Sequence, residues 1–250
     1  MGVLKKIVSI LELLRQEKSL GTIEIANMLD LPNSTVNRIL KELKWYGILE
    51  QNVETKKYSL GWKLVQLASE YLKGENDNYY IPLIKSYMRE LVEETKDTIY
   101  LCVMKQNRVI CICKVDGKSN LRYFAEVGKE FPLNCSAPAK VLLAYQPKDV
   151  QLNIIDNMEF EKLTDNSILD KDRFIEELDN TRLNGYGICI NEIEIGSSAV
   201  AVPILDKYGS ILASIALVGT REHVVEDFDH IIASMKQASH LITKQLIDKV

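Results

Sequence analysis

The sequence predicts an α+β protein in two parts: a small helical unit ending in a β-hairpin, and a larger domain in which helices flank an antiparallel sheet. In the first part, apolar residues recur at helical spacing. In the second, strand-like runs are separated by polar turns, as in paired strands. The polar segment 74–78 separates the two patterns, so we expect a first unit at 1–60, a linker helix at 61–78 and a second domain at 79–250.

Residues 22–50 predict two short helices joined by a tight turn. Thr22 is placed to cap the first helix, Pro32 breaks the pattern, and Asn33 or Ser34 could cap the second helix. Four apolar residues of the second helix share one spacing and should point into a core: Val36, Ile39, Leu40 and Leu43. The opposite face holds polar residues that suit a DNA groove, unless it is only a solvated surface: Ser34, Thr35, Asn37, Arg38 and Lys41.

A hairpin directly after these helices favours the DNA-binding interpretation. Gly47 suits a left-handed helix end, and residues 49–60 then resemble two short strands with a basic turn. A helix-turn-helix followed by a basic hairpin is typical of a winged helix, so Lys56 and Lys57 should contact backbone phosphate. Arg38 has the geometry to read guanine, and Asn37 the geometry to read adenine.

Composition and charge limit the class of protein. The chain has 250 residues, 46% of them hydrophobic, and no apolar run long enough to span a membrane. An export signal is not recognisable, and five cysteines without framework spacing fit a reducing compartment, so we expect a cytoplasmic protein. Residues 1–60 hold nine Lys or Arg against seven Asp or Glu, although the whole chain has 31 against 35. The acidic total therefore does not oppose DNA binding by the first unit.

Further helices and strands are predicted along the rest of the chain. The expected helices are 3–17, 61–73, 81–95, 136–145, 148–157, 171–183 and 224–248. The expected strands are 98–104, 109–115, 121–127, 199–205 and 210–218, with a hairpin turn at 206–209.

Three blocks stand in order along the sequence: LPNSTVNRIL at 31–40, FPLNCSAPAKVLLA at 131–144, and a third block from NGYG at 184–187 to LVG at 217–219. Together they resemble the IclR family of bacterial transcription regulators. The resemblance covers nearly the whole chain. It implies a winged helix-turn-helix domain, a linker helix and a GAF-like domain that binds a small-molecule effector and assembles into dimers or dimers of dimers.

The resemblance also implies an effector pocket in the second domain. Seven matching positions would line it: Ala137, Pro138, Cys189, Ser197, Ala199, Ala216 and Val218. Tyr123 and Phe131 would form its apolar wall. Several of these are apolar where the family often carries polar or acidic side chains. Because unpaired buried polar groups are costly, we expect an effector with more apolar or aromatic surface than a small keto acid. One carboxylate could still be served by Asn134, Ser136, Arg122 or Ser214.

The sequence allows two other functions to be considered, an enzyme and a redox-sensing regulator. Catalysis is disfavoured, because the three histidines lie in the last segment and no metal-binding, phosphate-binding or nucleophile motif is present; no cofactor or metal is expected. A redox-sensing regulator is the stronger alternative, since Cys135 would lie at a helix start that lowers a thiol pKa. Cys111 and Cys113 alternate on one strand and should face the same side, although small buried cysteines are also ordinary core residues.

Overall fold

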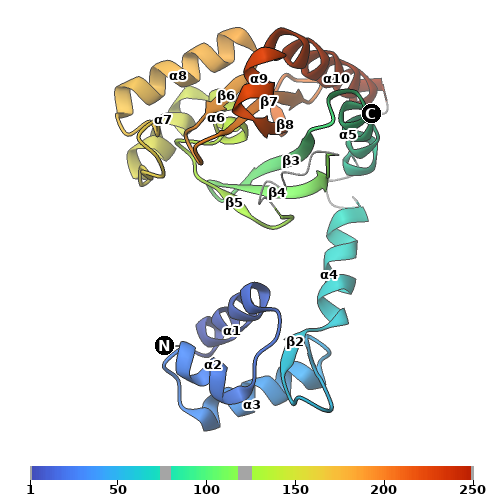
Figure 1. The fold of residues 1–250 in the computed structure, drawn as a ribbon, viewed down its shortest axis with the longest axis vertical. Coiled ribbons are helices and arrows are strands. Elements are labelled where there is room, and N and C mark those ends of the chain that lie inside the picture. Colours follow the sequence, from blue (N-terminus) through green and yellow to red (C-terminus); the bar gives the residue numbers. More distant parts are fainter. Residues whose placement is uncertain (1, 74–79, 118–125, 249–250) are drawn as a thin grey trace. The chain divides into compact units, whose positions relative to one another are not determined.

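The computed structural model describes residues 2–73, 80–117 and 126–248, and it divides into two compact units, Met1–Tyr79 and Tyr80–Val250. The first unit contains four helices and a hairpin among its described residues: α1 Val3–Glu17, α2 Thr22–Met28, α3 Asn33–Trp45, β1 Leu49–Gln51, β2 Tyr58–Leu60 and α4 Trp62–Lys73 (Figure 1). Its core is formed by apolar residues of α1, α2, α3 and both strands, including Ile10, Ile25, Leu40 and Tyr58. Whether α4 serves as a linker, as the boundaries 1–60, 61–78 and 79–250 assume, stays a prediction.

The ends of α2 and α3 differ from the predicted caps. Thr22 is the first residue of α2, and the cap position is Gly21, whose amide donates to Glu24 Oε2 at 2.6 Å. Pro32 holds the cap position of α3, so neither Asn33 nor Ser34 caps it with a side chain. Gly47 does adopt a left-handed conformation (φ 72°) just after α3. A Cβ on residue 47 would come within 3.1 Å of the Trp62 ring, a tight contact that adds a packing reason for this glycine.

The second unit is built on one antiparallel sheet with the order β5-β4-β3-β8-β7-β6. Its described strands are β3 Thr98–Lys105, β4 Arg108–Val115, β5 Glu130–Phe131, β6 Gly187–Ile190, β7 Ser197–Leu205 and β8 Ile211–Thr220. This arrangement is the predicted α+β class. The sequence interpretation missed β6 and β5, and it expected a strand at 121–127. Residues 118–125 lie outside the described part, and 126–127 are not in a strand.

Helices cover both faces of this sheet (Figure 1). α5 Ile81–Thr95 and α10 Phe228–Asp248 pack on one face and form the larger core. α6 Ala137–Ala144 covers the other face and is buried along its whole length, because α8 Lys171–Asn184 packs on its outer side with α7 Lys148–Asn157 nearby. The single helix expected at 224–248 is two helices, α9 Arg221–Glu226 and α10, with Asp227 between them.

A β-bulge corrects the predicted placement of two cysteines. Leu101 pairs with Cys113 but Cys102 pairs with Cys111, which leaves Ile112 as an extra residue in β4. A bulge of this kind shifts the alternation of side chains by one residue. Cys113 therefore packs in the core beneath α5 and α10, whereas Cys111 packs on the α6 face of the sheet.

Candidate functional site

The polar face of α3 is the candidate DNA-binding surface. The four predicted core residues of this helix, Val36, Ile39, Leu40 and Leu43, are buried, so the helix presents the opposite face to solvent. Four of the five predicted contact residues are exposed, and Thr35 is half-buried: Ser34, Thr35, Asn37, Arg38 and Lys41. Arg38 Nη1 lies 3.4 Å from Glu42 Oε1, in an exposed pair of the kind that contributes little to stability. Arg38 can therefore leave Glu42 for a base at small cost.

The hairpin is tied to two helices by polar contacts that the sequence did not indicate. Lys57 Nζ lies 3.2 Å from Glu24 Oε1 on α2. The Gly21 amide, and then Lys57, hold the pKa of the Glu24 carboxyl below its usual value. Gln51 accepts a hydrogen bond from Lys44 Nζ on α3 at 2.9 Å and donates to the Lys56 carbonyl at 3.0 Å. Lys57 is thus paired within the protein in this structure, although it was predicted to contact phosphate.

The tip of the hairpin is a compact turn. The side chain of Asn52 accepts hydrogen bonds from the amides of Glu54 and Thr55, both at 2.9 Å. Lys56 is exposed and takes a left-handed conformation, with φ 57°. These contacts set the direction in which the chain leaves the tip, so Lys56 is presented on a defined turn.

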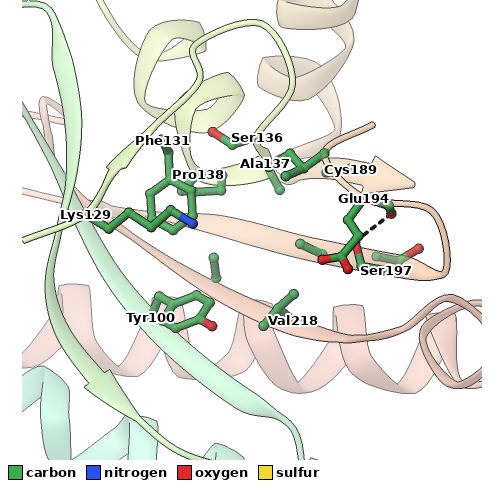
Figure 2. A pocket seen from close by; sticks show the side chains of 14 residues that line it. Tyr100, Lys129, Phe131, Ser136, Ala137, Pro138, Cys189, Glu194, Ser197 and Val218 are labelled. Carbon is green, nitrogen blue, oxygen red and sulfur yellow. Dashed lines mark hydrogen bonds between the residues drawn. The ribbon is translucent and has the colours of Figure 1, made fainter. Parts of the chain in front are cut away.

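The second unit contains a cavity of about 100 Å³ between α6 and the sheet. Eight of the nine predicted effector positions line it: Phe131, Ala137, Pro138, Cys189, Ser197, Ala199, Ala216 and Val218. Figure 2 labels all of these except Ala199 and Ala216. The ninth, Tyr123, lies outside the described residues, as does Arg122. The cavity is therefore assembled from β5, the start of α6, β6, β7 and β8, which are far apart in the sequence.

The cavity wall is mainly apolar. The rings of Tyr100 and Phe131 are 6.1 Å apart between centroids, and both line the cavity together with Pro138 and Val218. Burial raises the pKa of the Cys189 thiol to about 12, so this cysteine contributes an uncharged group. A wall of this kind favours a ligand with apolar surface, because burying that surface is the main gain on binding.

Polar groups enter the cavity at a few points that sequence reasoning missed. Lys129, Glu194 and Tyr100 line the cavity but were not predicted. Ser136 also lines it, yet its hydroxyl donates to the Pro132 carbonyl at 2.8 Å. The alternation of β3 could have identified Tyr100, which shares a face with Cys102. No signal in the sequence marked the two charged residues.

Two other predicted carboxylate partners do not line the cavity. The amide of Asn134 donates to the carbonyls of Glu161 and Ile168, at 2.9 and 2.8 Å, and so holds a loop in place. The hydroxyl of Ser214 donates to the Val202 carbonyl within the sheet. Both side chains are fully buried and already paired, which leaves them structural roles.

A buried ion pair supports the loop beside the cavity. Lys140 Nζ lies 2.6 Å from Glu192 Oε1 and 3.1 Å from Glu177 Oε1, and it donates to the Ile188 carbonyl at 2.8 Å. The Lys140 side chain is 1% exposed and that of Glu192 is 9% exposed. Burial raises the pKa of the Glu192 carboxyl, and Lys140 opposes this shift by favouring the charged form. The loop 191–196 is thereby anchored to α6.

The cysteines are placed as core residues. All five are free and buried. Cys135 precedes α6 by two residues, and burial raises the pKa of its thiol, where the sequence interpretation expected a helix start to lower it. Burial also raises the pKa of Cys113. Cys135 and Cys113 therefore lack the thiolate character that reactive cysteines show. A hydrogen bond with Cys102 instead lowers the pKa of the buried Cys111 thiol, so the structure disfavours redox sensing at Cys135 and Cys113, and at Cys111 it stays a prediction.

Two of the three histidines, His223 and His230, each lie beside a different carboxylate. His223 Nε2 lies 3.0 Å from Asp97 Oδ2, and His230 Nε2 lies 3.3 Å from Glu94 Oε1. Within residues 2–73, 80–117 and 126–248, no group of three or more His, Cys, Asp or Glu side chains is placed to hold a metal ion. None of the helices in the same ranges has the length and apolar character needed to cross a membrane.

Sequence profiles of one family match both units. The family described as "Bacterial transcriptional regulator IclR C-terminal" matches residues 81–244, and "IclR helix-turn-helix domain" matches residues 3–53. The chain is 31% identical over 245 residues to the transcriptional regulator KdgR of Escherichia coli K12, covering 96% of this chain and 91% of that protein. It is 24% identical over 245 residues to the regulator KipR of Bacillus subtilis 168, covering 96% and 95%.

Solved structures share the fold over nearly the full length. The Thermotoga maritima IclR structure superposes with a TM-score of 0.81 at 24% identity, covering 97% of this chain and 98% of that one. An IclR homologue of Microbacterium hydrocarbonoxydans, solved with 4-hydroxybenzoate, superposes with a TM-score of 0.85 at 22% identity, covering 98% and 99%. At these identities the similarity establishes the fold of the chain.

Proposed function

Because the chain belongs to the IclR family of bacterial transcription regulators, we propose that a small molecule bound in its second unit changes how strongly its first unit binds an operator. The observation that carries this proposal is the cavity beneath α6, where eight positions inferred from the family resemblance come together. The relatives are transcription regulators, and we propose no catalytic activity. Such a regulator would act where chromosomal DNA is, in the cytoplasm.

In the first unit, we propose a division of labour between specificity and affinity. Arg38, Asn37, Thr35 and Ser34 read base edges, because they share the exposed side of α3 near its start. Lys41, Lys56 and Lys57 contact phosphate, which positions the protein without reading sequence. Lys57 would leave Glu24 to do so, and that step is inexpensive because both side chains are about half-exposed.

The effector we propose is a small organic acid with apolar or aromatic surface. A cavity of about 100 Å³ is comparable with the engineered cavity of about 150 Å³ that binds benzene. Its wall consists largely of rings, methyl groups and uncharged thiol, so a highly polar keto acid would leave its own groups unpaired. The similar fold of the homologue solved with 4-hydroxybenzoate makes aromatic acids a reasonable first set to test.

We also propose that the chain works as a homodimer or a dimer of dimers, in which α4 relays the effector signal. Apolar side chains on the first unit support an interface there: Leu4 is 80% exposed, Val8 58%, Val65 72% and Leu67 58%. A dimer would present two α3 helices to half-sites one helical turn apart, or a multiple of that. The effector can shift the placement of these helices only by binding one arrangement more tightly than the other.

A thermal-shift screen tests the effector proposal. The panel pairs benzoate and 4-hydroxybenzoate with glyoxylate and pyruvate, and the control is Ala199→Leu, which fills the cavity from β7. An acid at one hundred times its Kd should stabilise the wild type by about 2.7 kcal/mol and leave the control unchanged. Stabilisation by glyoxylate or pyruvate alone, or an equal response in Ala199→Leu, would overturn the proposal.

A further inference from the structure

Two side chains of opposite charge border the cavity in the second unit. Figure 2 shows the amino group of Lys129 and the carboxylate of Glu194 reaching the cavity from opposite sides, with apolar side chains such as Phe131 and Val218 around the space. A uniformly apolar cavity would accept any small hydrocarbon. This cavity has two electrically distinct ends, and the difference has consequences for which acids can bind.

The Glu194 end is held rigidly. The Ser197 hydroxyl donates to the Glu194 carbonyl at 2.9 Å, and the Ser197 amide donates to the same carbonyl at 3.2 Å. The side chain of Asn191 accepts from the Gly196 amide at 2.8 Å, which closes the loop on itself. Glu192 then fixes the loop to α6 through the buried pair with Lys140. The backbone beneath Glu194 is therefore fixed before any ligand arrives.

Glu194 is exposed at the border of the cavity, and within the described chain no hydrogen bond or ion pair engages its carboxylate, since the neighbouring residues contact only its backbone. A ligand group placed there would meet a negative charge that has no protein partner. A hydroxyl or ammonium group could donate to that charge in a strong charge-assisted hydrogen bond. A second carboxylate on the ligand would be repelled and would also lose its water.

The other end of the cavity favours an anion. Lys129 is held by its backbone, since its amide donates to the Glu126 carbonyl and its carbonyl accepts from the Cys111 amide, each at 3.0 Å. The N-terminus of α6 adds partial positive charge to the cavity wall at Ala137. One carboxylate can therefore be accommodated in the cavity, provided that it lies away from Glu194.

We infer that the cavity selects monoanions that carry a hydrogen-bond donor remote from the anionic group, that it rejects dianions, and that Glu194 sets this specificity. The inference rests on the proposed function, because it presumes that small acids occupy the cavity. The specificity of Glu194 adds which small acids bind in the cavity. Hydroxy acids of suitable size bind, simple monoacids bind less tightly, and dicarboxylates bind least.

Calorimetric titration of the full-length chain with two matched sets of probes tests the inference. The aromatic set is benzoate, 3- and 4-hydroxybenzoate, and terephthalate; the aliphatic set is butyrate, 4-hydroxybutyrate and succinate. For wild type, at least one hydroxy acid should bind about tenfold more tightly than its unsubstituted parent, which corresponds to about 1.4 kcal/mol. The dianion of the same set should bind more weakly still.

Glu194→Gln separates a charge effect from a shape effect. Glutamine keeps the size of the side chain but removes its charge, so the preference for the hydroxy acid should shrink and the dianion should gain about tenfold. The matched control is Glu176→Gln, an exposed glutamate on α8 that does not line the cavity, and it should behave as wild type.

The outcomes distinguish an error in the specificity assigned to Glu194 from an error in the proposed effector function. If wild type binds a dianion as tightly as the matching hydroxy acid, or if Glu194→Gln leaves the ranking unchanged, the specificity assigned to Glu194 is wrong and the effector site stands. If only the aliphatic set binds, the aromatic class proposed above is wrong, and the charge inference is judged on that set. Failure of every probe to bind would overturn both.

Discussion

The two candidate sites of this protein are built in opposite ways. The proposed DNA-binding surface lies on one helix and the hairpin that follows it, and its predicted contacts are exposed apart from the half-buried Thr35 and Lys57. The proposed effector cavity draws on segments from Tyr100 to Val218 and is mainly apolar. The first site can therefore bind through charge with little change in the protein, whereas the second depends on the packing that brings distant segments together.

The lysines of the two units show the same contrast. Lys57 and Glu24 form a pair in which both side chains are more than 40% exposed. Lys140 and Glu192 form a pair in which both are nearly inaccessible. Water screens the first pair, so it contributes little and can exchange for phosphate. The second pair is shielded from water, so removing one partner leaves an uncompensated buried charge.

The largest expected effect is on the buried pair. Lys140→Met should destabilise the second unit by about 3 kcal/mol, because the buried Glu192 loses its main partner. Lys148→Met is the matched control: its partner Asp179 is exposed, so the change should cost less than about 1 kcal/mol. Urea unfolding followed by far-UV circular dichroism measures both. Equal losses in the two variants would remove the contrast between exposed and buried lysines.

Tryptophan fluorescence provides an internal control for this measurement. Both tryptophans, Trp45 and Trp62, lie in the first unit. Their unfolding transition should stay where it is in wild type when Lys140 is replaced. A shift of the fluorescence transition as large as that of the dichroism would show that the substitution acts on the whole molecule.

The next effect concerns base reading by α3. Arg38→Ala should weaken operator binding by about 1–3 kcal/mol and relax the sequence preference, because a base contact is lost. Lys57→Ala should weaken binding to all sequences alike and lower the salt dependence, because a phosphate contact is lost. Anisotropy titrations against operator and scrambled DNA compare the two. The assignment of roles is wrong if Lys57→Ala relaxes sequence preference more than Arg38→Ala does.

A smaller effect in the opposite direction is expected for Glu24→Gln. Glutamine can still accept from the Gly21 amide, but it no longer holds Lys57 by charge. Freed from this pair, Lys57 should strengthen DNA binding by roughly twofold to fivefold regardless of sequence, in line with the small value of an exposed pair. The same titrations measure it. Weaker binding in this variant would mean that the Glu24 pair positions the hairpin for DNA.

The smallest effect concerns pH. Burial raises the pKa of Asp97, although His223 opposes the shift. The Asp97 carboxyl therefore keeps its proton to a higher pH in the folded state than in the unfolded state. The free energy of unfolding falls as the pH rises from the pKa of the unfolded state through the higher pKa of the folded state. The stability of wild type relative to Asp97→Asn should fall as pH is raised through that window. A relative stability that rises with pH would contradict the burial of this carboxyl.

The sequence was sufficient for the buried face of α3 because the information there is local. Spacing of apolar residues identified the buried face of α3, and Gly47 marked its end. The predicted cap of α2 was wrong because a residue inside the helix can satisfy its start, as Glu24 does for the Gly21 amide. The predicted caps of α3 were wrong because Pro32 holds that position. The ion pair between Lys57 and Glu24 joins residues far apart in the sequence, so no local pattern could show it.

The second site was predicted only where a family resemblance supplied positions. The charged residues at its edge were missed, because Lys129 and Glu194 reach the cavity only through the folded path of two loops. The bulge in β4 reversed Cys111 relative to Cys113, since strict alternation cannot anticipate an extra residue. The break at Asp227 was missed because no glycine or proline marks it.

The measurement that tests the central claim most directly is a fluorescence-anisotropy titration of wild type and Ala199→Leu against DNA from upstream of the protein's own gene. Each is titrated with and without the acid that gives the largest thermal shift. The account predicts that the acid changes the operator affinity of wild type several-fold and leaves that of Ala199→Leu unchanged. Equal responses in the two proteins, or none in wild type with the cavity occupied, would contradict the claim that this cavity controls DNA binding.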